Sequence, residues 1–129
     1  MNQNKPIILV DPYPRTMDLL FSKANLKYLK KNFKLITAPN KNKNNFYKKN
    51  LSKADYIFGQ PSLPTSLISK STKLKAIFNV ESNFMDNMDY DYCFRKGIHV
   101  LATSPVFAQP VAEMAIGLTL SIARSIHIA

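Results

Sequence analysis

Glycine is scarce in this sequence, with only three such residues in 129. They are Gly59, Gly97 and Gly117, and no two of them lie close together. A dinucleotide-binding turn needs closely spaced glycines between a strand and a helix, because the backbone must approach the pyrophosphate. The pattern Gly-x-Gly-x-x-Gly is absent, so we expect no self-contained site for NAD or NADP on this chain.

Cysteine and histidine are also too few for several kinds of chemistry. The single Cys93 cannot form an internal disulfide, and the opening residues, Met-Asn-Gln-Asn-Lys-Pro, contain no apolar signal core. Both features predict a reducing, cytoplasmic compartment. His99 and His127 are isolated and have no partners at metal-binding spacing. We therefore expect no metal site, and we expect His99 to pack in a strand or lie on the surface.

Acidic residues number only eight, against 18 lysines and arginines, and the net charge is +10. Residues 1–75 carry +12 of this charge, whereas residues 76–129 carry −2. The positive charge is mostly lysine, scattered among asparagines without the arginine clusters or interleaved aromatics that follow a phosphate backbone. We therefore expect a solvated lysine surface and no nucleic-acid partner.

No uninterrupted apolar run approaches the ~18 residues of a membrane span. The most apolar segment lies near the C-terminus, where Glu113, Thr119, Ser121 and Arg124 interrupt it. No membrane anchor is expected. This segment is nevertheless apolar on almost every side, which is more than a helix packed on one face needs.

Five short apolar runs alternate with stretches of helical spacing. The runs are rich in β-branched residues and end in turn residues, which predicts buried parallel strands. We expect strands over 6–11, 33–37, 54–59, 74–80 and 97–101, and helices over 16–33, 46–53, 63–71, 89–96 and 109–126. Parallel neighbours need right-handed crossovers. The pattern predicts a single α/β domain over residues 1–129, with a flavodoxin-like sheet of strand order 2-1-3-4-5.

Particular residues mark the expected ends of these helices. Ser62 is placed to cap the third helix and Asp89 the fourth, because short polar side chains accept hydrogen bonds from free helical N–H groups. Gly97 is expected to end the fourth helix in the left-handed conformation. Pro110 suits a first helical turn, so the last helix is expected to begin near Gln109.

Four short motifs follow one another in the second half of the sequence. They are Leu-Lys-Ala-Ile at 74–77, Met-Asp-Asn-Met-Asp at 85–89, Phe-Arg-Lys-Gly-Ile-His-Val at 94–100 and Val-Ala-Glu at 111–113, before a helix that ends in Ala-Arg at 123–124. In this order and spacing, the stretch resembles the amino-terminal, substrate-binding (catalytic) domain of the D-isomer-specific 2-hydroxyacid dehydrogenases. That family includes phosphoglycerate, glyoxylate and formate dehydrogenase relatives. Residues 1–73 match it only in their pattern of strands and helices.

The resemblance implies an NAD(P)-dependent oxidoreductase that transfers a hydride from the CH–OH group of a small 2-hydroxy acid. NAD or NADP is the expected cofactor of the complete enzyme, and a small 2-hydroxy or 2-oxo acid is the expected ligand. In the family, the catalytic Arg, Glu and His lie in or beside a cofactor domain that follows a crossover helix, here about residues 109–127. The sequence stops at that helix, so we expect a substrate-side half without the cofactor domain, inactive alone. Arg124 and His127 lie in or beyond the helix and are not assigned as the catalytic pair.

The same helix implies a partner. Its second apolar side would contact the absent cofactor domain or, as the family's dimers suggest, a second copy of the chain.

The resemblance also implies a loop whose backbone amides bind the substrate carboxylate, since oriented N–H groups stabilise an anion. The family usually has Gly-x-Gly just before its Asp-Asn, and here the aligned residues are Ser82, Asn83 and Phe84. Loss of both glycines excludes some conformations with positive φ, although Asn83 tolerates the left-handed region. Phe84 either narrows the substrate pocket or packs inward.

On the cofactor side, Ser104 or Thr103 aligns with a family position that touches the nicotinamide part of the cleft. Val111 lies near that position at the expected start of the last helix. These residues are the expected cofactor-binding contacts of this chain.

Four further polar residues have two possible roles. Gln60 and Ser62 follow a predicted strand end and are candidates for the rim of a site, although turn hydrogen bonding is the favoured role. Asp86 and Asp89 could act as acid or base, but turn hydrogen bonding and helix capping are favoured for them.

An alternative class of function fits the same fold. A free-standing flavodoxin-like module could bind a small anion or a protein partner without catalysing a reaction. A continuation of the reading frame into a strand and a Gly-x-Gly-x-x-Gly turn would favour the dehydrogenase.

Overall fold

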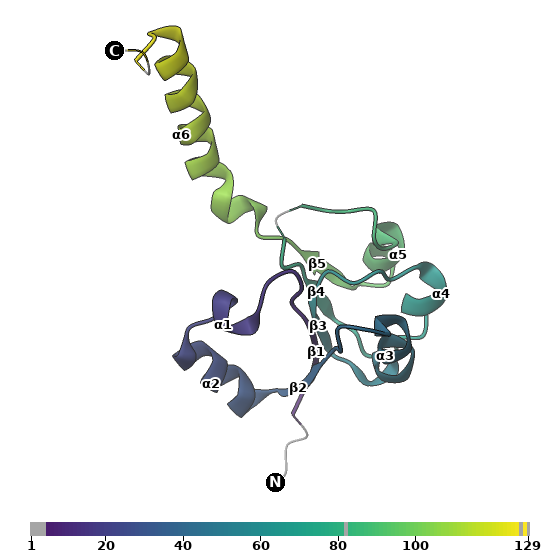
Figure 1. Ribbon diagram of the computed structural model, residues 1–129. Coiled ribbons are helices and arrows are strands. Elements are labelled where there is room, and N and C mark those ends of the chain that lie inside the picture. Colours follow the sequence, from purple (N-terminus) through teal and green to yellow (C-terminus); the bar gives the residue numbers. More distant parts are fainter. Residues whose placement is uncertain (1–4, 82, 127, 129) are drawn as a thin grey trace.

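A parallel sheet forms the centre of the computed structural model, which describes residues 5–81, 83–126 and 128 (Figure 1). Its strands are β1 (Ile7–Asp11), β2 (Lys34–Thr37), β3 (Tyr56–Gly59), β4 (Ala76–Phe78) and β5 (His99–Leu101). They lie in the order β2-β1-β3-β4-β5, and every neighbouring pair is parallel. The predicted α/β class and strand order are confirmed.

Helices connect the strands of this sheet, and a last helix follows β5. They are α1 (Met17–Leu20), α2 (Lys23–Asn32), α3 (Lys43–Asn50), the 3-10 turn η1 (Leu51–Lys53), α4 (Thr65–Ile68), α5 (Tyr90–Arg95) and α6 (Ser104–Ala123). Helices α1 and α2 lie on one face, α3, α4 and α5 lie on the other, and α6 extends away from both (Figure 1).

The core lies between the sheet and the α3, α4 and α5 layer. Leu9, Ile57 and Ile77 of the three central strands are fully buried there, together with Tyr47 of α3. Cys93 of α5 is also fully buried, and this burial raises the pKa of its thiol. The central strands are thus covered completely on this face, as their continuous apolar character predicts.

The opposite face of the sheet is only partly covered. A cavity of about 470 Å³ remains between the sheet and helices α1 and α2, and its lining is almost entirely apolar. The rings of Phe21 and Phe58 meet across this space with centroids 5.2 Å apart. Towards the other edge, Phe78 of β4 is 38% exposed and Leu101 of β5 is 49% exposed.

The single helix predicted over residues 16–33 is wrong, because the structure has two helices there. Thr16 caps α1 by accepting from the Leu19 amide, and Ser22 caps α2 by accepting from the Asn25 amide. Between them Phe21 is extended, with φ −130° and ψ 139°. Its ring contact with Phe58 is a tertiary interaction that replaces one turn of the expected helix.

The predicted helix over 63–71 is also shorter in the structure, and Ser62 does not cap it. The N-cap of α4 is Pro64, which makes no side-chain capping bond. Leu63 is held extended because its amide donates to the Asn87 carbonyl at 2.7 Å, and because residues before proline avoid the helical region. By contrast, the predicted roles of Asp89 and Gly97 are confirmed: Asp89 accepts from the Tyr92 amide at 2.8 Å, and Gly97 has φ +70°.

Helix α6 begins at Ser104 and not near Gln109 as predicted. Pro105, the second residue of α6, takes the first-turn position where the missing N–H costs nothing. Pro110 therefore lies inside the helix and not in its first turn. The helix ends at Ala123, earlier than the predicted residue 126, and Ser125 follows with φ +51°.

No residue of α6 is buried. Eight large apolar side chains on it are each more than half exposed: Val106, Phe107, Val111, Met114, Ile116, Leu118, Leu120 and Ile122. By length and composition alone, α6 would also be able to cross a membrane. A helix of this composition is stable in water only when another surface covers it.

Gly59 ends β3 at a point where two backbones almost touch. Its φ is +149°, and a Cβ atom built on it would lie only 2.3 Å from the Asp11 carbonyl oxygen. Asp11 is the residue paired with Gly59 across β1 and β3. Only glycine fits at this position, so the contact fixes where the chain leaves β3.

We expect Gly59→Ala to lower the free energy of unfolding by about 3 kcal/mol, because it adds both a backbone clash and an unfavourable φ. Urea unfolding followed by circular dichroism measures the change. Gly117→Ala is the matched control, since no atom lies within 4 Å of its Cβ position, and it should not lower stability. Equal stability of the Gly59→Ala protein and the parent would contradict the assigned close approach.

Candidate functional site

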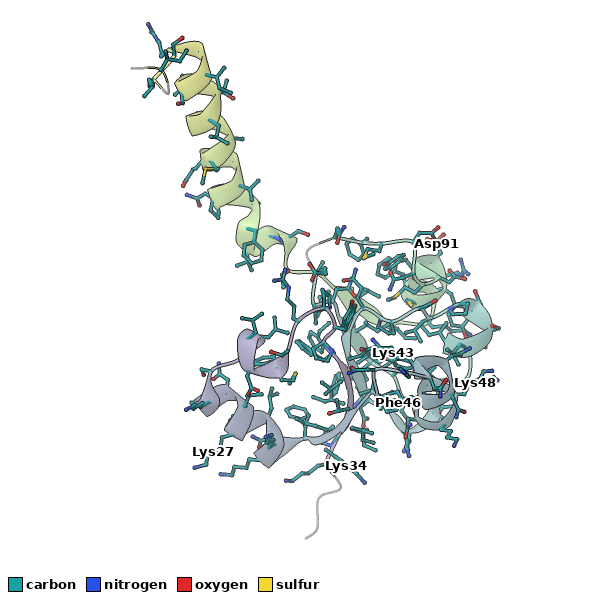
Figure 2. All side chains as sticks on the ribbon, viewed as in Figure 1. Lys27, Lys34, Lys43, Phe46, Lys48 and Asp91 are labelled. Atoms are coloured by element: carbon teal, nitrogen blue, oxygen red, sulfur yellow. The ribbon has the colours of Figure 1, made fainter. Side chains whose placement is uncertain are left out.

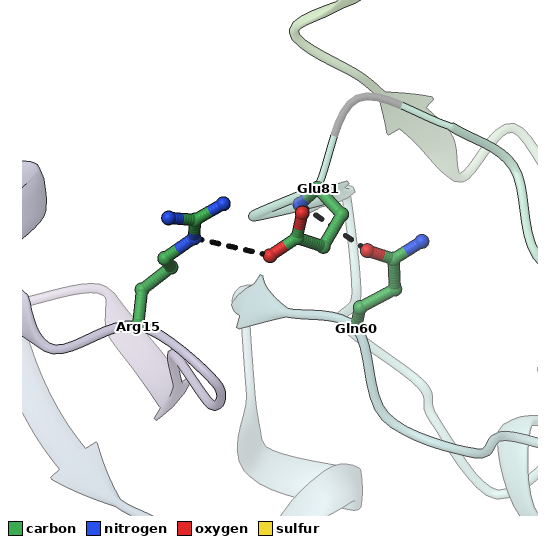
Figure 3. Close-up of polar contacts among 3 residues, drawn as sticks. All are labelled: Arg15, Gln60 and Glu81. Atoms are coloured by element: carbon green, nitrogen blue, oxygen red, sulfur yellow. Dashed lines mark hydrogen bonds and ion pairs between the residues drawn. The ribbon is translucent and has the colours of Figure 1, made fainter.

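The carboxyl ends of β1, β3 and β4 bring three loops together at one edge of the sheet. Figure 3 shows a residue from each: Arg15 after β1, Gln60 after β3 and Glu81 after β4. The Arg15 Nε donates to the Glu81 Oε1 at 3.2 Å, and the Glu81 amide donates to the Gln60 Oε1 at 3.2 Å. Ligands of open α/β sheets bind at this kind of edge.

Gln60 makes two contacts with the loop that follows β4. Besides accepting from the Glu81 amide, it donates from Nε2 to the Asn83 carbonyl at 2.8 Å. The sequence favours hydrogen bonding within the Gln60 turn, but the Gln60 side chain bonds the neighbouring loop instead. Gln60 is a rim residue in contact with the predicted substrate loop.

The predicted substrate residues differ in how they lie. Ser82 is outside the described residues. Asn83 is exposed and does not use the left-handed region, since among the described residues the only non-glycine positions with positive φ are Asn42 and Ser125. Phe84 is 56% exposed, and its ring meets the Tyr90 ring edge-on at 5.2 Å. This exposed position argues against inward packing, one of the two expected roles of Phe84.

Asp89 is held in a structural role. Its carboxylate accepts from the Thr65 hydroxyl and from the Tyr92 amide. The Thr65 hydrogen bond, followed by the Tyr92 amide, lowers the pKa of Asp89 below its ordinary value. Both contacts stabilise the ionised form, and the Tyr92 contact is the predicted helix cap. Asp86 is exposed, and its side chain forms no hydrogen bond within the described part of the chain.

Ser104 and Val111, the expected cofactor contacts, lie at different distances from this edge. Ser104 is the first residue of α6, directly after β5, which pairs with β4. It therefore lies at the same edge of the sheet as the loop after β4. Val111 lies seven residues further along α6, a rise of about 10 Å. Both residues are exposed.

A buried polar cluster at the end of β1 was not anticipated from the sequence. Asp11 is 5% exposed, its Oδ1 accepts from the Lys43 Nζ at 2.6 Å, and its Oδ2 accepts from the Tyr47 hydroxyl at 3.3 Å. Burial, then the charge and hydrogen bond of Asp11, raise the pKa of Tyr47. The sequence does place an acidic residue, Asp11, at the end of an apolar strand, but it predicts only the strand end there.

Lys43 differs from the other lysines in its position. It lies at the sheet edge and approaches the Tyr13 ring to 5.0 Å, whereas Lys27, Lys34 and Lys48 extend from the outer surface (Figure 2). The outer lysines agree with the predicted solvated surface.

A polar cavity of about 330 Å³ adjoins the Asp11 cluster. Its lining comes from the loops after β1 and β3 and from the start of α3: Asp11, Tyr13, Lys43, Asn44, Tyr47, Gln60, Pro61, Ser62 and Pro64. Because Gln60 also bonds the loop after β4, the cavity and that loop share a wall.

Asn79, at the end of β4, is a second residue that the sequence reading missed. It is 3% exposed, and its side-chain nitrogen and oxygen have no hydrogen-bond partner within the described residues. Buried polar groups are normally bonded, so this carboxamide is an unusual feature of the edge.

The described residues contain no group of three His, Cys, Asp or Glu side chains that could hold a metal ion. His99 lies on β5 and is exposed, one of its two expected positions.

Comparison with known proteins shows which family the chain resembles. Residues 15–127 match the profile of the D-isomer specific 2-hydroxyacid dehydrogenase catalytic domain. A phosphoglycerate oxidoreductase from Rhizobium etli is 38% identical, with a TM-score of 0.75 over 95% of this chain and 38% of that chain. Comparison with curated proteins gives no significant match.

Two more distant structures share the fold. The PH0520 protein from Pyrococcus horikoshii is 23% identical, with a TM-score of 0.71 over 97% of this chain and 35% of its own. The 3-phosphoglycerate dehydrogenase of Entamoeba histolytica, solved with NAD+, is 21% identical, with a TM-score of 0.65 over 91% and 39%. The chain thus spans less than two fifths of each of these relatives.

The capping role of Asp89 gives a pH dependence. Because its folded pKa is lowered, its charge stabilises the fold above the unfolded pKa of about 3.9, and this contribution is lost as pH falls through the folded value. We expect Asp89→Asn to be less stable than the parent at pH 7 and equally stable near pH 2, by urea unfolding.

Thr65→Val serves as the companion variant, since it removes the main cause of the shift. The pKa of Asp89, followed by NMR of its carboxyl carbon, should rise towards its ordinary value. A stability difference for Asp89→Asn that is the same at both pH values would contradict the assignment.

Proposed function

Because the chain belongs to the D-isomer specific 2-hydroxyacid dehydrogenases, as their catalytic domain, we propose that it binds the substrate of an NAD(P)-dependent oxidoreductase. The substrate is a small 2-hydroxy acid whose CH–OH group loses a hydride. The Rhizobium etli relative is a phosphoglycerate oxidoreductase by name, so acids of that size are the first to test.

The observation that carries this proposal is the loop after β4. Within the described residues, the amides of Asn83 and Phe84 donate to no carbonyl or side chain, and Asn83 is exposed at the carboxyl edge of the sheet. Two neighbouring free N–H groups suit a carboxylate, because they stabilise the anion without a charged side chain. The role proposed for this chain is to bind and orient the acid.

The proposal places the dinucleotide site outside this chain. The loops after β1, β3 and β4 contain no glycine-rich turn, and α6, whose first residue is Ser104, leads away from the sheet (Figure 1). We therefore assign the nicotinamide cofactor to a domain outside these 129 residues, in line with the greater length of the relatives. Ser104 would contact it only from the substrate side.

The polar cavity beside Asp11 supports a second candidate, a module that binds a small polar ligand without catalysis. Its lining includes Lys43, Asn44 and Ser62, all able to donate hydrogen bonds. The experiment below separates the two candidates, since only the dehydrogenase gives hydride transfer.

The test is a chimaera in which residues 1–123 replace the matching domain of the Rhizobium etli protein. We expect NAD-dependent oxidation of a 2-hydroxy acid. In this chimaera Asn83→Pro should raise the substrate KM about tenfold or more, with little change in NADH affinity, because it removes one amide donor. Asn83→Ala, which keeps the amide, is the matched control and should stay near the parent KM. A folded chimaera without activity on any 2-hydroxy acid would count against the dehydrogenase and for the binding module.

Helix α6 is proposed to contact the cofactor domain or a second copy of the chain. Its apolar side chains are exposed along its whole length, and it lies within the stretch that matches the family. Burying about 300 Å² of this surface would contribute about 7 kcal/mol before association entropy is subtracted. A contact of that size makes self-association competitive when no other domain is present.

We expect the 129-residue chain to sediment as a dimer or larger species. Leu120→Glu, which places a charge on the exposed apolar surface, should shift it towards monomer. Leu19→Glu, on α1, replaces a similarly exposed leucine away from α6 and is the control. A soluble monomer of the parent at high micromolar concentration would contradict this role, and cosedimentation with lipid vesicles would instead indicate a membrane contact.

A further inference from the structure

The Gln60 side chain makes two hydrogen bonds to the first part of the loop after β4, at residues 81 and 83. Its carboxamide holds the backbone on both sides of residue 82, accepting from the Glu81 amide at 3.2 Å and donating to the Asn83 carbonyl at 2.8 Å. The other described contact there is the Arg15 to Glu81 ion pair, which is exposed and contributes little.

The last part of the same loop is held by different groups. The Tyr90 hydroxyl bonds the Met85 carbonyl at 2.7 Å, and the Asn87 Nδ2 donates to the Pro61 carbonyl at 2.7 Å. The amides of Asn83 and Phe84, which donate to no group in the described part of the chain, therefore have the Gln60 contacts on one side and those of Tyr90 and Asn87 on the other. Loss of Gln60 would release only the first segment.

Gln60 itself starts from a fixed point. Gln60 follows Gly59, whose backbone lies close to the Asp11 carbonyl. The pairing of β1 with β3 therefore fixes the backbone direction at Gln60. Because the Gln60 backbone is fixed at the end of β3, its two hydrogen bonds fix the loop after β4 relative to β1 and β3. This matters because residues 82–84 include no glycine, so the loop lacks the conformational freedom that glycine would give it.

We propose that Gln60 is a positioning residue, which holds the amides of Asn83 and Phe84 in the orientation that receives the substrate carboxylate. The proposal rests on the proposed function, because it assigns Gln60 a task in binding a 2-hydroxy or 2-oxo acid. Gln60 acts through the loop backbone and carries out no chemical step.

The experiment uses the 129-residue chain labelled with 15N and glyoxylate as the probe. In the parent, we expect saturable shifts of the Asn83 and Phe84 amide signals. In Gln60→Ala we expect the dissociation constant for glyoxylate to rise about tenfold or more, because two hydrogen bonds that order the donors are lost. Gln60→Glu keeps the acceptor but cannot donate to the Asn83 carbonyl, and it should also bind more weakly.

Two further variants serve as a control and as a replacement for Gln60→Ala. Asn32→Ala removes a carboxamide that donates to the Tyr28 carbonyl at 2.8 Å on exposed α2, and it should bind glyoxylate as the parent does. Gln60→Met keeps the length of the side chain without its polar atoms, and it provides the same measurement if the alanine variant unfolds. A purely structural role would lower the free energy of unfolding of these variants while the dissociation constant of the folded protein stayed the same.

The outcomes separate this inference from the proposed function. Unchanged glyoxylate affinity in folded Gln60→Ala or Gln60→Met would overturn the role of Gln60, whereas an active chimaera would leave the dehydrogenase assignment standing. Absence of chemical-shift changes at the Asn83 and Phe84 amides of the parent would also overturn the role of Gln60. If the chimaera is inactive as well, the proposed function fails with it.

Discussion

The close approach of the β1 and β3 backbones at Asp11 and Gly59 sets the geometry of the candidate site at this edge of the sheet. A side chain at position 59 would overlap the Asp11 carbonyl, so the two strands can pair to their last residue only with glycine there. Beyond this pair, the segments that follow β1 and β3 separate. Asp11 enters the buried cluster with Lys43 and Tyr47, and Gln60 reaches across to the loop after β4. Two sets of polar contacts thus depend on one backbone contact.

The fold was predictable because its main signals are local. Apolar runs such as 54–59 and 74–80 alternate with helical stretches, and parallel pairing with right-handed crossovers leaves few possible strand orders. The errors arise where tertiary contacts override local preference. Phe21 leaves the helix to meet Phe58, and Leu63 is extended by its bond to Asn87. Pro110 was read as a first-turn proline although Pro105 already occupies that position.

The candidate site was predictable only in part. Family resemblance points to residues 82–84 because they directly precede the Met-Asp-Asn-Met-Asp motif at 85–89. The contact of Gln60 with that loop joins residues more than 20 positions apart, and the Asp11 to Lys43 pair spans 32 positions. Pairings across that distance follow from the fold and leave no local pattern. The buried carboxamide of Asn79 was likewise hidden, since an asparagine at the end of a strand usually indicates a turn.

The central claim is that this edge holds the carboxylate of a 2-hydroxy or 2-oxo acid with backbone amides. The most direct measurement is a crystal structure of the Rhizobium etli chimaera with glyoxylate bound. The account predicts a carboxylate oxygen within hydrogen-bond distance, about 2.7–3.2 Å, of the Asn83 or Phe84 nitrogen, with Gln60 still bonded to the loop. Glyoxylate bound instead to Lys43 in the polar cavity, with the loop amides unoccupied, would contradict it.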